Sequence, residues 1–394
     1  MTKSVNSIDD LAGRARAMLA QLVAFDTTSR LSNLSMIAFV EDWLGRLGIT
    51  THRVSNADGT KANLYATIGP MVEGGVVLSG HTDVVPVDGQ PWTSDPFLLT
   101  EREGRLYGRG TCDMKGFIAL ALAAAPDFAR AGLNRPIHVA LSYDEEVGCL
   151  GAPSMIKELA RQLPTPAAVI VGEPTNMEVV GGHKGISSWW VTVTGHEAHS
   201  SLTHLGVSAN MVAVELMHEL VLLAAELARD TDPDGRFVPS HSTLTIGQVN
   251  GGTAVNILAR QCSFVFDLRT LPGEDPNAIV APFLAKAAQV HAQISKRFPE
   301  CGVEVVRRSE TPAMALRSDG AAAMLARSLA GDNGASRVVA YAAEGGQFQQ
   351  AGFDTVICGP GSIEQAHQPN EYLELEQLRR GANFMVRLKE WSGR

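Results

Sequence analysis

Short, mainly apolar runs recur along the chain, and polar or acidic residues follow each of them. Four such runs stand out, at residues 76–78, 137–143, 167–171 and 354–358. A short apolar run is typical of a strand buried on both faces, as in a parallel sheet covered by helices. The pattern therefore predicts an α/β fold.

Helical periodicity separates these runs. Apolar residues recur three and four positions apart over residues 8–23, 33–47 and 115–131, which predicts three helices. Ser7 is expected to cap the first helix, with Asp10 as its capping partner. Pro126 lies inside the third, where we expect a kink.

A different pattern occupies the middle of the chain. Alternating polar and apolar residues predict strands, and helical periods separate them. The strands are expected at 186–194, 242–249, 261–270 and 303–308, and the helices at 209–227 and 276–298. This β-α-β-β-α-β order is that of a ferredoxin-like domain. We therefore expect a discontinuous catalytic domain with a mixed-sheet α/β fold, residues 1–185 and 310–394, interrupted by an inserted domain, residues 186–309.

Composition narrows the choice of partners. The chain has 394 residues, 45% hydrophobic and 19% charged, with a formal net charge of -9. An acidic protein is not attracted to nucleic acid or to an anionic membrane, so we expect neither as a partner. No 18-residue apolar stretch and no hydrophobic signal core are found, which predicts a cytoplasmic protein. Cys112 is a minor candidate for a soft metal ligand, because no second thiol is near it in sequence.

Candidate metal ligands and proton-transfer groups follow the apolar runs or a glycine turn. In open α/β sheets, the loops at the carboxyl ends of strands form the active site. Histidines and carboxylates on such loops suit a site for two metal ions. The candidates are His81, Asp83, Asp113, Glu145, Glu146, Glu173 and His367.

Each candidate also has a structural explanation. His81 and Asp83 share a face of an extended segment, so one can bind metal while the other orients it, or both can belong to a capped turn. Asp113 has two oxygens that can bridge two cations, but it can also cap a helix. Glu145 and Glu146 point differently and can divide the roles of ligand and general base, or they are exposed loop charges. Considered together, these residues favour a metal site.

Long motifs carry a resemblance over residues 27–372. They are S-G-H-T-D-V-V-P, G-R-G-T-C-D-M-K-G, D-E-E, G-E-P-T, K-G at 184–185, G-H-E-A-H-S-S, G-G-T-A-V-N, D-L-R and G-P-G-S-I-E-Q-A-H-Q-P-N-E. In this order, they are similar to the M20 family of metal-dependent amidohydrolases and peptidases. Y-A-A-E followed by the last motif most resembles the branch that deacetylates N-acetyl-L-ornithine.

The resemblance implies a set of roles. His81, Asp113 and Glu173 would hold one metal, and Asp113, Glu146 and His367 the other. Glu145 would be the general base, and Asp83 would support His81. His199 would reach the partner subunit's site in a homodimer and stabilise the oxyanion. The inserted domain would be a lid and dimerisation domain, with hinges near 185 and 310.

The resemblance also implies a small-molecule substrate, an N-acyl amino acid. Asn256 and Arg269 would hold its carboxylate, a task suited to a guanidinium group. Glu344 would pair with an ammonium group, and Gly359 and Gly361 would also contact substrate.

The expected reaction converts N-acetyl-L-ornithine to L-ornithine and acetate in arginine biosynthesis, with two divalent ions, zinc first and cobalt as the alternative. The alternatives are another M20 amidohydrolase, namely an N-acyl-amino-acid deacylase, a succinyl-diaminopimelate desuccinylase or a dipeptidase, and, more remotely, a non-catalytic binding protein on this fold.

Overall fold

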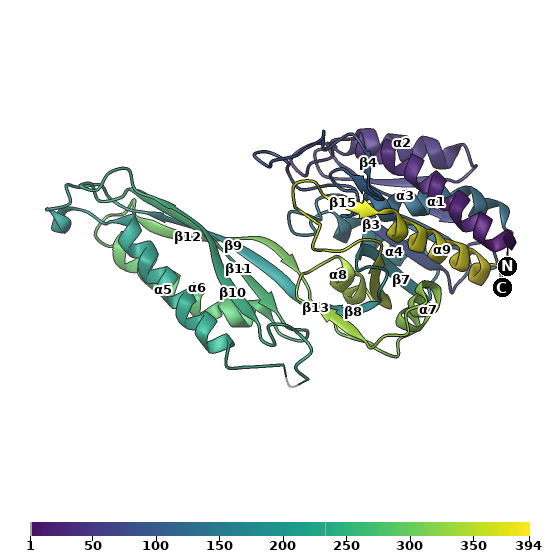
Figure 1. The fold of residues 1–394 in the computed structure, drawn as a ribbon. Helices are drawn as coiled ribbons and strands as arrows, with labels where there is room; N and C mark the ends of the chain where they lie inside the picture. The colour runs from purple at the N-terminus through teal and green to yellow at the C-terminus, as the bar shows by residue number, and fades with distance from the viewer. Residues whose placement is uncertain (1, 233) are drawn as a thin grey trace. The chain divides into compact units, whose positions relative to one another are not determined.

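The chain forms two compact units in the computed structural model, which describes residues 2–232 and 234–394. The first unit comprises the chain up to Gly182, Met314–Val338 and Ala343–Arg394. The second comprises His183–Ala313 and Val339–Ala342. The first unit is thus assembled from separate stretches of sequence (Figure 1).

An eight-stranded mixed sheet forms the centre of the first unit, in the order β1-β2-β6-β3-β7-β14-β8-β13. β6, β3, β7 and β14 run parallel to their neighbours in this series, whereas β1, β2 and β8 pair antiparallel. The strands are β1 (Thr51–Ser55), β2 (Ala62–Ile68), β3 (Val76–His81), β6 (Ile137–Ser142), β7 (Ala168–Pro174), β8 (Val180–His183), β13 (Arg337–Val339) and β14 (Thr355–Gly359). The predicted mixed α/β fold is confirmed.

Helices cover both faces of this sheet, which explains why every residue of β3, β6, β7 and β14 is buried. Only alternate strand residues, such as Val76 and Leu78, join the core that includes α1, α3 and α9. The other side chains must therefore be buried on the opposite face, where α4 contacts β2 and β6. The helices are α1 (Thr2–Val23), α2 (Leu34–Gly45), α3 (Lys115–Arg130), α4 (Ala152–Gln162), α7 (Ala321–Ala330), α8 (Gly345–Gln350) and α9 (Leu375–Ser392).

Some local predictions need correction. α1 already includes Ser7, so Ser7 is not its N-cap. α3 is one helix that continues through Pro126. Its N-cap is Met114, and Asp113 does not cap it with a side-chain hydrogen bond. The structural explanation of Asp113 as a helix cap is therefore excluded, which leaves its carboxylate available for other partners.

The second unit is a four-stranded antiparallel sheet, in the order β10-β11-β9-β12, packed against two helices. Over its described residues, the elements follow the order β-α-β-β-α-β, interrupted only by the short 3-10 helix η1 (Thr203–Leu205). Residues of β9 and β11 are more and less buried in alternation, because one face of the sheet packs on the helices. The elements are β9 (Gly185–Thr194), α5 (Ala209–Leu227), β10 (Thr243–Gly251), β11 (Gln261–Thr270), α6 (Pro276–Ser295) and β12 (Gly302–Thr311).

A third, small sheet belongs to the first unit and pairs β15 (Tyr372–Glu374) with β5 (Arg105–Tyr107), which also pairs with β4 (Thr100–Arg102). It holds the segment before Asp113 beside the segment that follows His367 in sequence. Among the described helices, none combines the length and hydrophobicity needed to span a membrane.

Candidate metal centre

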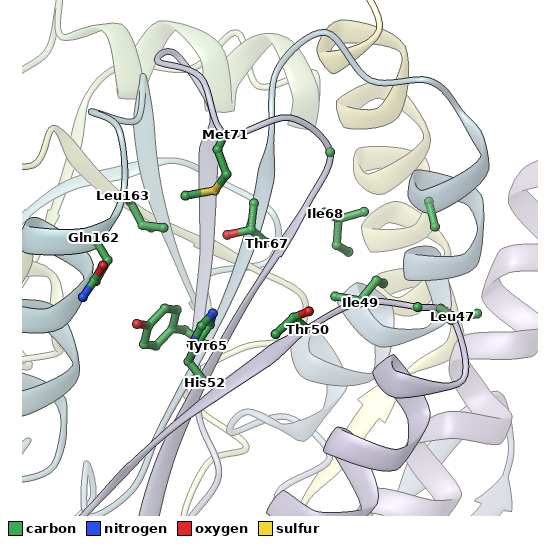
Figure 2. Close-up of a pocket in the computed structure, with 13 residues that line it drawn as sticks. Leu47, Ile49, Thr50, His52, Tyr65, Thr67, Ile68, Met71, Gln162 and Leu163 are labelled. Atoms are coloured by element: carbon green, nitrogen blue, oxygen red, sulfur yellow. The ribbon is translucent and has the colours of Figure 1, made fainter.

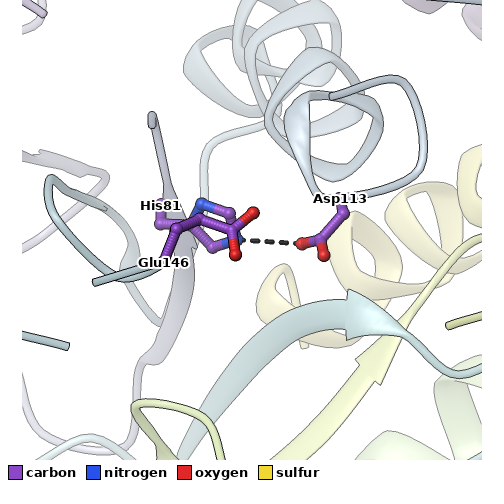
Figure 3. A group of neighbouring side chains, drawn as sticks. All are labelled: His81, Asp113 and Glu146. Atoms are coloured by element: carbon purple, nitrogen blue, oxygen red, sulfur yellow. Dashed lines mark hydrogen bonds and ion pairs between the residues drawn. The ribbon is translucent and has the colours of Figure 1, made fainter. Parts of the chain in front are cut away.

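The candidate ligands meet at one edge of the large sheet. His81 ends β3, Glu145 and Glu146 follow β6, and Glu173 lies near the end of β7. Because these strands are parallel, their carboxyl ends lie at the same edge. Asp113 reaches this edge from the loop before α3. Figure 3 shows Asp113 facing His81, with Glu146 beside that histidine.

The two oxygens of Asp113 face two different histidines. Its Oδ1 lies 3.0 Å from Nε2 of His81, and its Oδ2 lies 3.4 Å from Nε2 of His367. The same nitrogen of His367 lies 2.9 Å from Oε2 of Glu146. A carboxylate whose two oxygens face different candidate ligands has an arrangement that can bridge two cations.

Among the described residues, two groups of side chains bring ligand atoms within 4.8 Å of one another, namely His81–Asp113–Glu146 and His81–Glu145–Glu173. These two groups have His81 in common, whereas the two ligand sets implied by the family resemblance have Asp113 in common. Glu145, the expected base, is thus also within reach of a ligand position.

Asp83 was expected to support His81, and it does so mainly through its backbone. Its backbone carbonyl lies 2.9 Å from Nδ1 of His81, whereas its carboxylate oxygen lies 3.7 Å from that nitrogen. A hydrogen on Nδ1 leaves Nε2 with a lone pair for a cation. The carboxylate instead accepts hydrogen bonds from the backbone N–H groups of Glu145 and Glu146 and from Ser29 Oγ. Asp83 therefore orients the acidic loop as well as the histidine.

The electrostatics of this cluster favour a cation. Burial and the nearby charge of Asp113 raise the pKa of Glu146 to about 7 and that of Glu173 well above its usual value. Burial would also raise the pKa of Asp113, but hydrogen bonds from His367 and His81 hold it below the usual value. Hydrogen bonds to Asp113 and Glu146 raise the pKa of His367 to about 10. These carboxylates therefore strongly stabilise nearby positive charge.

Unpaired oxygens support the same interpretation. Glu146 Oε1 and Glu173 Oε1 are buried and have no hydrogen-bond partner among the described residues. A buried carboxylate oxygen without a partner is costly, and a divalent cation would satisfy it. The donor set of imidazole and carboxylate groups suits zinc, cobalt or manganese. The residues present therefore fit a metal site.

A buried ion pair that the sequence pattern did not predict positions the loop of Asp113. Glu371 accepts hydrogen bonds from the backbone N–H groups of Gly110, Cys112 and Asp113, at 2.9 to 3.1 Å. Arg109, which is 1% exposed, donates to the same carboxylate at 2.7 Å. The sequence signal for this ion pair was that both residues lie in quoted motifs, Arg109 in G-R-G-T-C-D-M-K-G and Glu371 in the last one.

The same arginine connects to the second histidine. Arg109 donates to Gln90 Oε1, and Gln90 Nε2 donates to the carbonyl of His367 at 2.9 Å. The side chain of His367 is 53% exposed, so this contact restrains a residue that packing alone holds loosely. One network thus supports two candidate ligands.

Cys112 is directed away from the cluster. Its thiol donates to the carbonyl of Ser362 at 3.2 Å, and burial raises its pKa well above the usual value. It belongs to neither candidate ligand group.

Gly359 ends β14, where that strand pairs with β7, and Gly361 lies just beyond it beside Cys112 and Leu373. A side chain at Gly359 would stand 2.1 Å from the carbonyl oxygen of Gly172, so only glycine fits there. Gly361 has a φ of +91°, which also favours glycine. Their packing explains these residues without substrate, and contact with substrate remains a prediction.

Glu344 lies beneath the site. It is 1% exposed, and burial raises its pKa to about 7. Its Oε1 and the hydroxyl groups of Ser142 and Ser79 are buried and have no hydrogen-bond partner among the described residues. Ser79 is two residues before His81, and Ser142 pairs with His81 in the sheet, so all three share one face. A substrate ammonium group would have to be fully desolvated to meet this carboxylate.

The remaining candidates, His199, Asn256 and Arg269, belong to the second unit. His199 pairs with Ile257 in an isolated bridge, and its Nδ1 lies 2.8 Å from Ser201 Oγ. Asn256 is next to this bridge and accepts a backbone hydrogen bond from Ser200 at 3.0 Å. Arg269 lies on β11 and donates to Asp267 at 3.0 Å. His199 and Asn256 are thus neighbours.

A hollow elsewhere in the first unit contains none of these residues (Figure 2). It has a volume of about 710 Å³ and is lined by residues of β1, β2, their adjoining loops and the ends of α3 and α4, among them His52 stacked on Tyr65 at 4.9 Å. Its lining, all in the described part of the chain, includes no Asp, Glu, Lys or Arg. It therefore lacks the charged groups that the edge of the sheet supplies.

The fold and the cluster together define a metal-dependent hydrolase. Residues 77–390 match the model of peptidase family M20/M25/M40, and the chain belongs to this family. It is 35% identical to an acetylornithine deacetylase of Proteus mirabilis, over 93% of this chain and 92% of that protein. It is 36% identical to one of Myxococcus xanthus, over 96% and 98% of the two chains. The family resemblance predicted from the motifs is confirmed.

Solved structures show the same fold. An M20 family metallo-carboxypeptidase from Sulfolobus solfataricus superposes with a TM-score of 0.79 at 17% identity, covering 95% of this chain and 98% of that one. The YXEP protein of Bacillus subtilis, a dinuclear metal-binding peptidase of the M20 family, superposes with a TM-score of 0.62 at 16% identity, covering 97% and 98%.

Proposed function

We propose that the protein hydrolyses the amide bond of an N-acyl amino acid at a site for two divalent cations. His81, Asp113 and Glu173 would hold one cation, and Asp113, Glu146 and His367 the other. The observation that carries this proposal is the placement of the two oxygens of Asp113, at 3.0 Å from His81 and 3.4 Å from His367. Bound cations would polarise the amide carbonyl and make water more acidic.

In this proposal, Glu145 carries the proton. It accepts a proton from the attacking water and then delivers it to the departing amine. Asp83 keeps Glu145 in place through the backbone hydrogen bond at 3.1 Å. His199 of the partner subunit donates a hydrogen bond to the oxyanion as it forms.

The favoured substrate is N-acetyl-L-ornithine, which would yield L-ornithine for arginine biosynthesis in the cytoplasm. The two acetylornithine deacetylases at 35% and 36% identity support this choice. Arg269 and Asn256 would bind the substrate's carboxylate, with Gly359 and Gly361 bordering the substrate. Glu344 would pair with its side-chain ammonium group, because a buried carboxylate pairs strongly with a cation.

Zinc is the proposed metal, with cobalt as the alternative. We also propose a homodimer formed through the inserted domain, residues 186–309, which would act as a lid on hinges near 185 and 310. The exposed apolar side chains of Met211, Val214 and Val221 on α5 support an interface there. Sedimentation analysis tests the dimer, and a monomer at micromolar concentration would contradict it.

A substrate panel tests the function. Zinc- and cobalt-loaded protein and a chelated sample are assayed on N-acetyl-L-ornithine, N-acetyl-methionine, succinyl-diaminopimelate and a dipeptide. We expect a preference for N-acetyl-L-ornithine that chelation removes. A preference for another substrate would retain the hydrolysis and reject the pathway, and inactivity on all four would favour a binding protein.

The Glu344→Gln variant tests the basis of substrate choice. We expect the preference for N-acetyl-L-ornithine over N-acetyl-methionine to fall about tenfold or more, because an ammonium group loses its charged partner. Glu364→Gln, at an exposed position, is the matched control. An unchanged preference in Glu344→Gln would exclude this role of Glu344.

A further inference from the structure

The thiol of Cys149 contacts the proposed general base. Its Sγ donates to Oε1 of Glu145 at 3.3 Å, a normal distance for a hydrogen bond from sulfur. The backbone closes the same turn, since the N–H groups of Gly148 and Cys149 both donate to the carbonyl of Glu145, at 2.9 and 2.8 Å. Cys149 thus contacts Glu145 through both its main chain and its side chain.

Neighbouring elements fix the position of Cys149 itself. Gln347 on α8 donates from Nε2 to the carbonyl of Cys149 at 2.9 Å. Leu150 donates a backbone hydrogen bond to Asp144 at 3.0 Å, and Asp144 pairs with Lys61. Cys149 is 2% exposed, so its side chain has little room to turn. The thiol is therefore held in its orientation toward Glu145.

Glu145 lies close enough to the candidate metal ligands to become one of them. Its carboxylate has an oxygen within 4.8 Å of ligand atoms on both His81 and Glu173. A carboxylate there could become a metal ligand and would then be a poor base. A donor on Oε1 restrains rotation of the carboxylate and leaves Oε2 for the attacking water.

We propose that Cys149 is a positioning residue for the reaction, and that its thiol holds the Glu145 carboxylate in the orientation of a base and out of the metal coordination shell. This inference rests on the proposed role of Glu145. The proposed role of Cys149 differs from a simple packing role, because packing requires the volume of the side chain but no hydrogen-bond donor.

Kinetics of two variants at this position test the proposal in the metal-loaded enzyme. For Cys149→Ala, we expect kcat to fall about tenfold, a fraction of the general-base contribution, with KM unchanged. Cys149→Ser retains a donor at a shorter reach and should recover part of the loss. Cys301→Ala, which removes another buried thiol in the second unit, is the matched control and should leave kcat unchanged.

Two kinetic outcomes would overturn the proposal. One is a wild-type kcat in Cys149→Ala, and the other is a Cys149→Ser variant no more active than Cys149→Ala. Metal content, measured by elemental analysis, should stay at the wild-type value in both variants. A loss of metal that accounts for the loss of activity would show a structural role instead.

Infrared spectroscopy provides a measurement that does not depend on turnover. The S–H stretching band of Cys149, identified by subtracting the spectrum of Cys149→Ala, should move to higher frequency in Glu145→Ala, because the hydrogen bond is lost. An unmoved band would contradict the contact. Full turnover by Glu145→Ala would contradict the proposed base itself, whereas normal turnover by Cys149→Ala beside an inactive Glu145→Ala contradicts only the positioning role.

Discussion

The two units place their candidate residues in opposite environments. In the first unit, parallel strands end at one edge, where buried imidazole and carboxylate groups crowd together. In the second unit, an antiparallel sheet carries Arg269 on a strand, and His199 lies on an exposed loop beside Ser201. Charges buried together need a compensating cation, whereas exposed polar groups need none.

Because of this difference, the presence of a ligand can be inferred from the first unit but not from the second. Unpaired oxygens and shifted pKa values in the first unit indicate a ligand before any substrate is considered. His199 and Arg269 make ordinary local hydrogen bonds, so their proposed contributions can arise only when substrate binds. Substitutions should therefore have their largest effects in the first unit.

Replacing the proposed base tests the first unit most severely. Glu145→Ala should lower kcat by about 10²- to 10⁴-fold, because proton transfer loses its acceptor. Metal content should stay at the wild-type value, since Glu145 is not in the proposed ligand set. Asp113→Ala is the contrasting variant, and we expect it to lose both metal and turnover. Elemental analysis beside steady-state kinetics separates these cases, and metal loss in Glu145→Ala would make Glu145 a ligand.

The second unit should show a smaller effect that is confined to turnover. His199→Ala should lower kcat about 10²- to 10³-fold, as expected when one donor to an oxyanion is removed. Metal content and KM should change little. His204→Ala, on the nearby helix η1, is the matched control. Equal activity of His199→Ala and His204→Ala would mean that His199 takes no part in catalysis and that the catalytic residues all lie in the first unit.

The network behind Asp113 should have an intermediate effect on the metal. Glu371→Gln loses the ion pair with Arg109 and presents an amide group to backbone N–H donors. We expect metal affinity to fall about 10- to 100-fold, as for other residues that orient metal ligands. Competition with a chelator measures this affinity. Glu374→Gln, on an exposed position of β15, should bind metal like the wild type.

Strand ends were the part of the site that the sequence could predict. His81, Glu145 and Glu173 follow apolar runs, and the parallel pairing of β3, β6 and β7 brings them together. The support network could not be predicted in this way, because Arg109 and Glu371 are 262 residues apart and show no periodic pattern. Contacts between distant loops depend on the finished packing.

Local detail at the site was predictable only in part. The pairing of His81 with residue 83 was anticipated, but the carbonyl rather than the carboxylate of Asp83 makes the closer contact. That choice depends on a side-chain rotamer, which the spacing of residues does not determine. The short strands β4, β5 and β15 were not predicted, since three residues show too little alternation.

The smallest effect expected at neutral pH concerns the stability of the two units toward acid. Each unit buries a histidine, His138 or His183, whose pKa is lowered to about 4 by burial. The unfolded chain binds a proton near pH 6.5 and the folded chain only near 4, so stability is intact above 6.5 and falls as the pH decreases between these values. The loss due to His138 should reach about 3 kcal/mol.

The His138→Gln variant isolates this contribution, because glutamine does not titrate. Denaturant unfolding of chelated protein at pH 7.5, 5.5 and 4.5 should show a shallower loss of stability in the variant than in the wild type, with His183 unchanged in both. Parallel losses in the two proteins would mean that His138 can take up a proton in the folded first unit. The acid sensitivity of that unit would then arise from its carboxylate cluster alone.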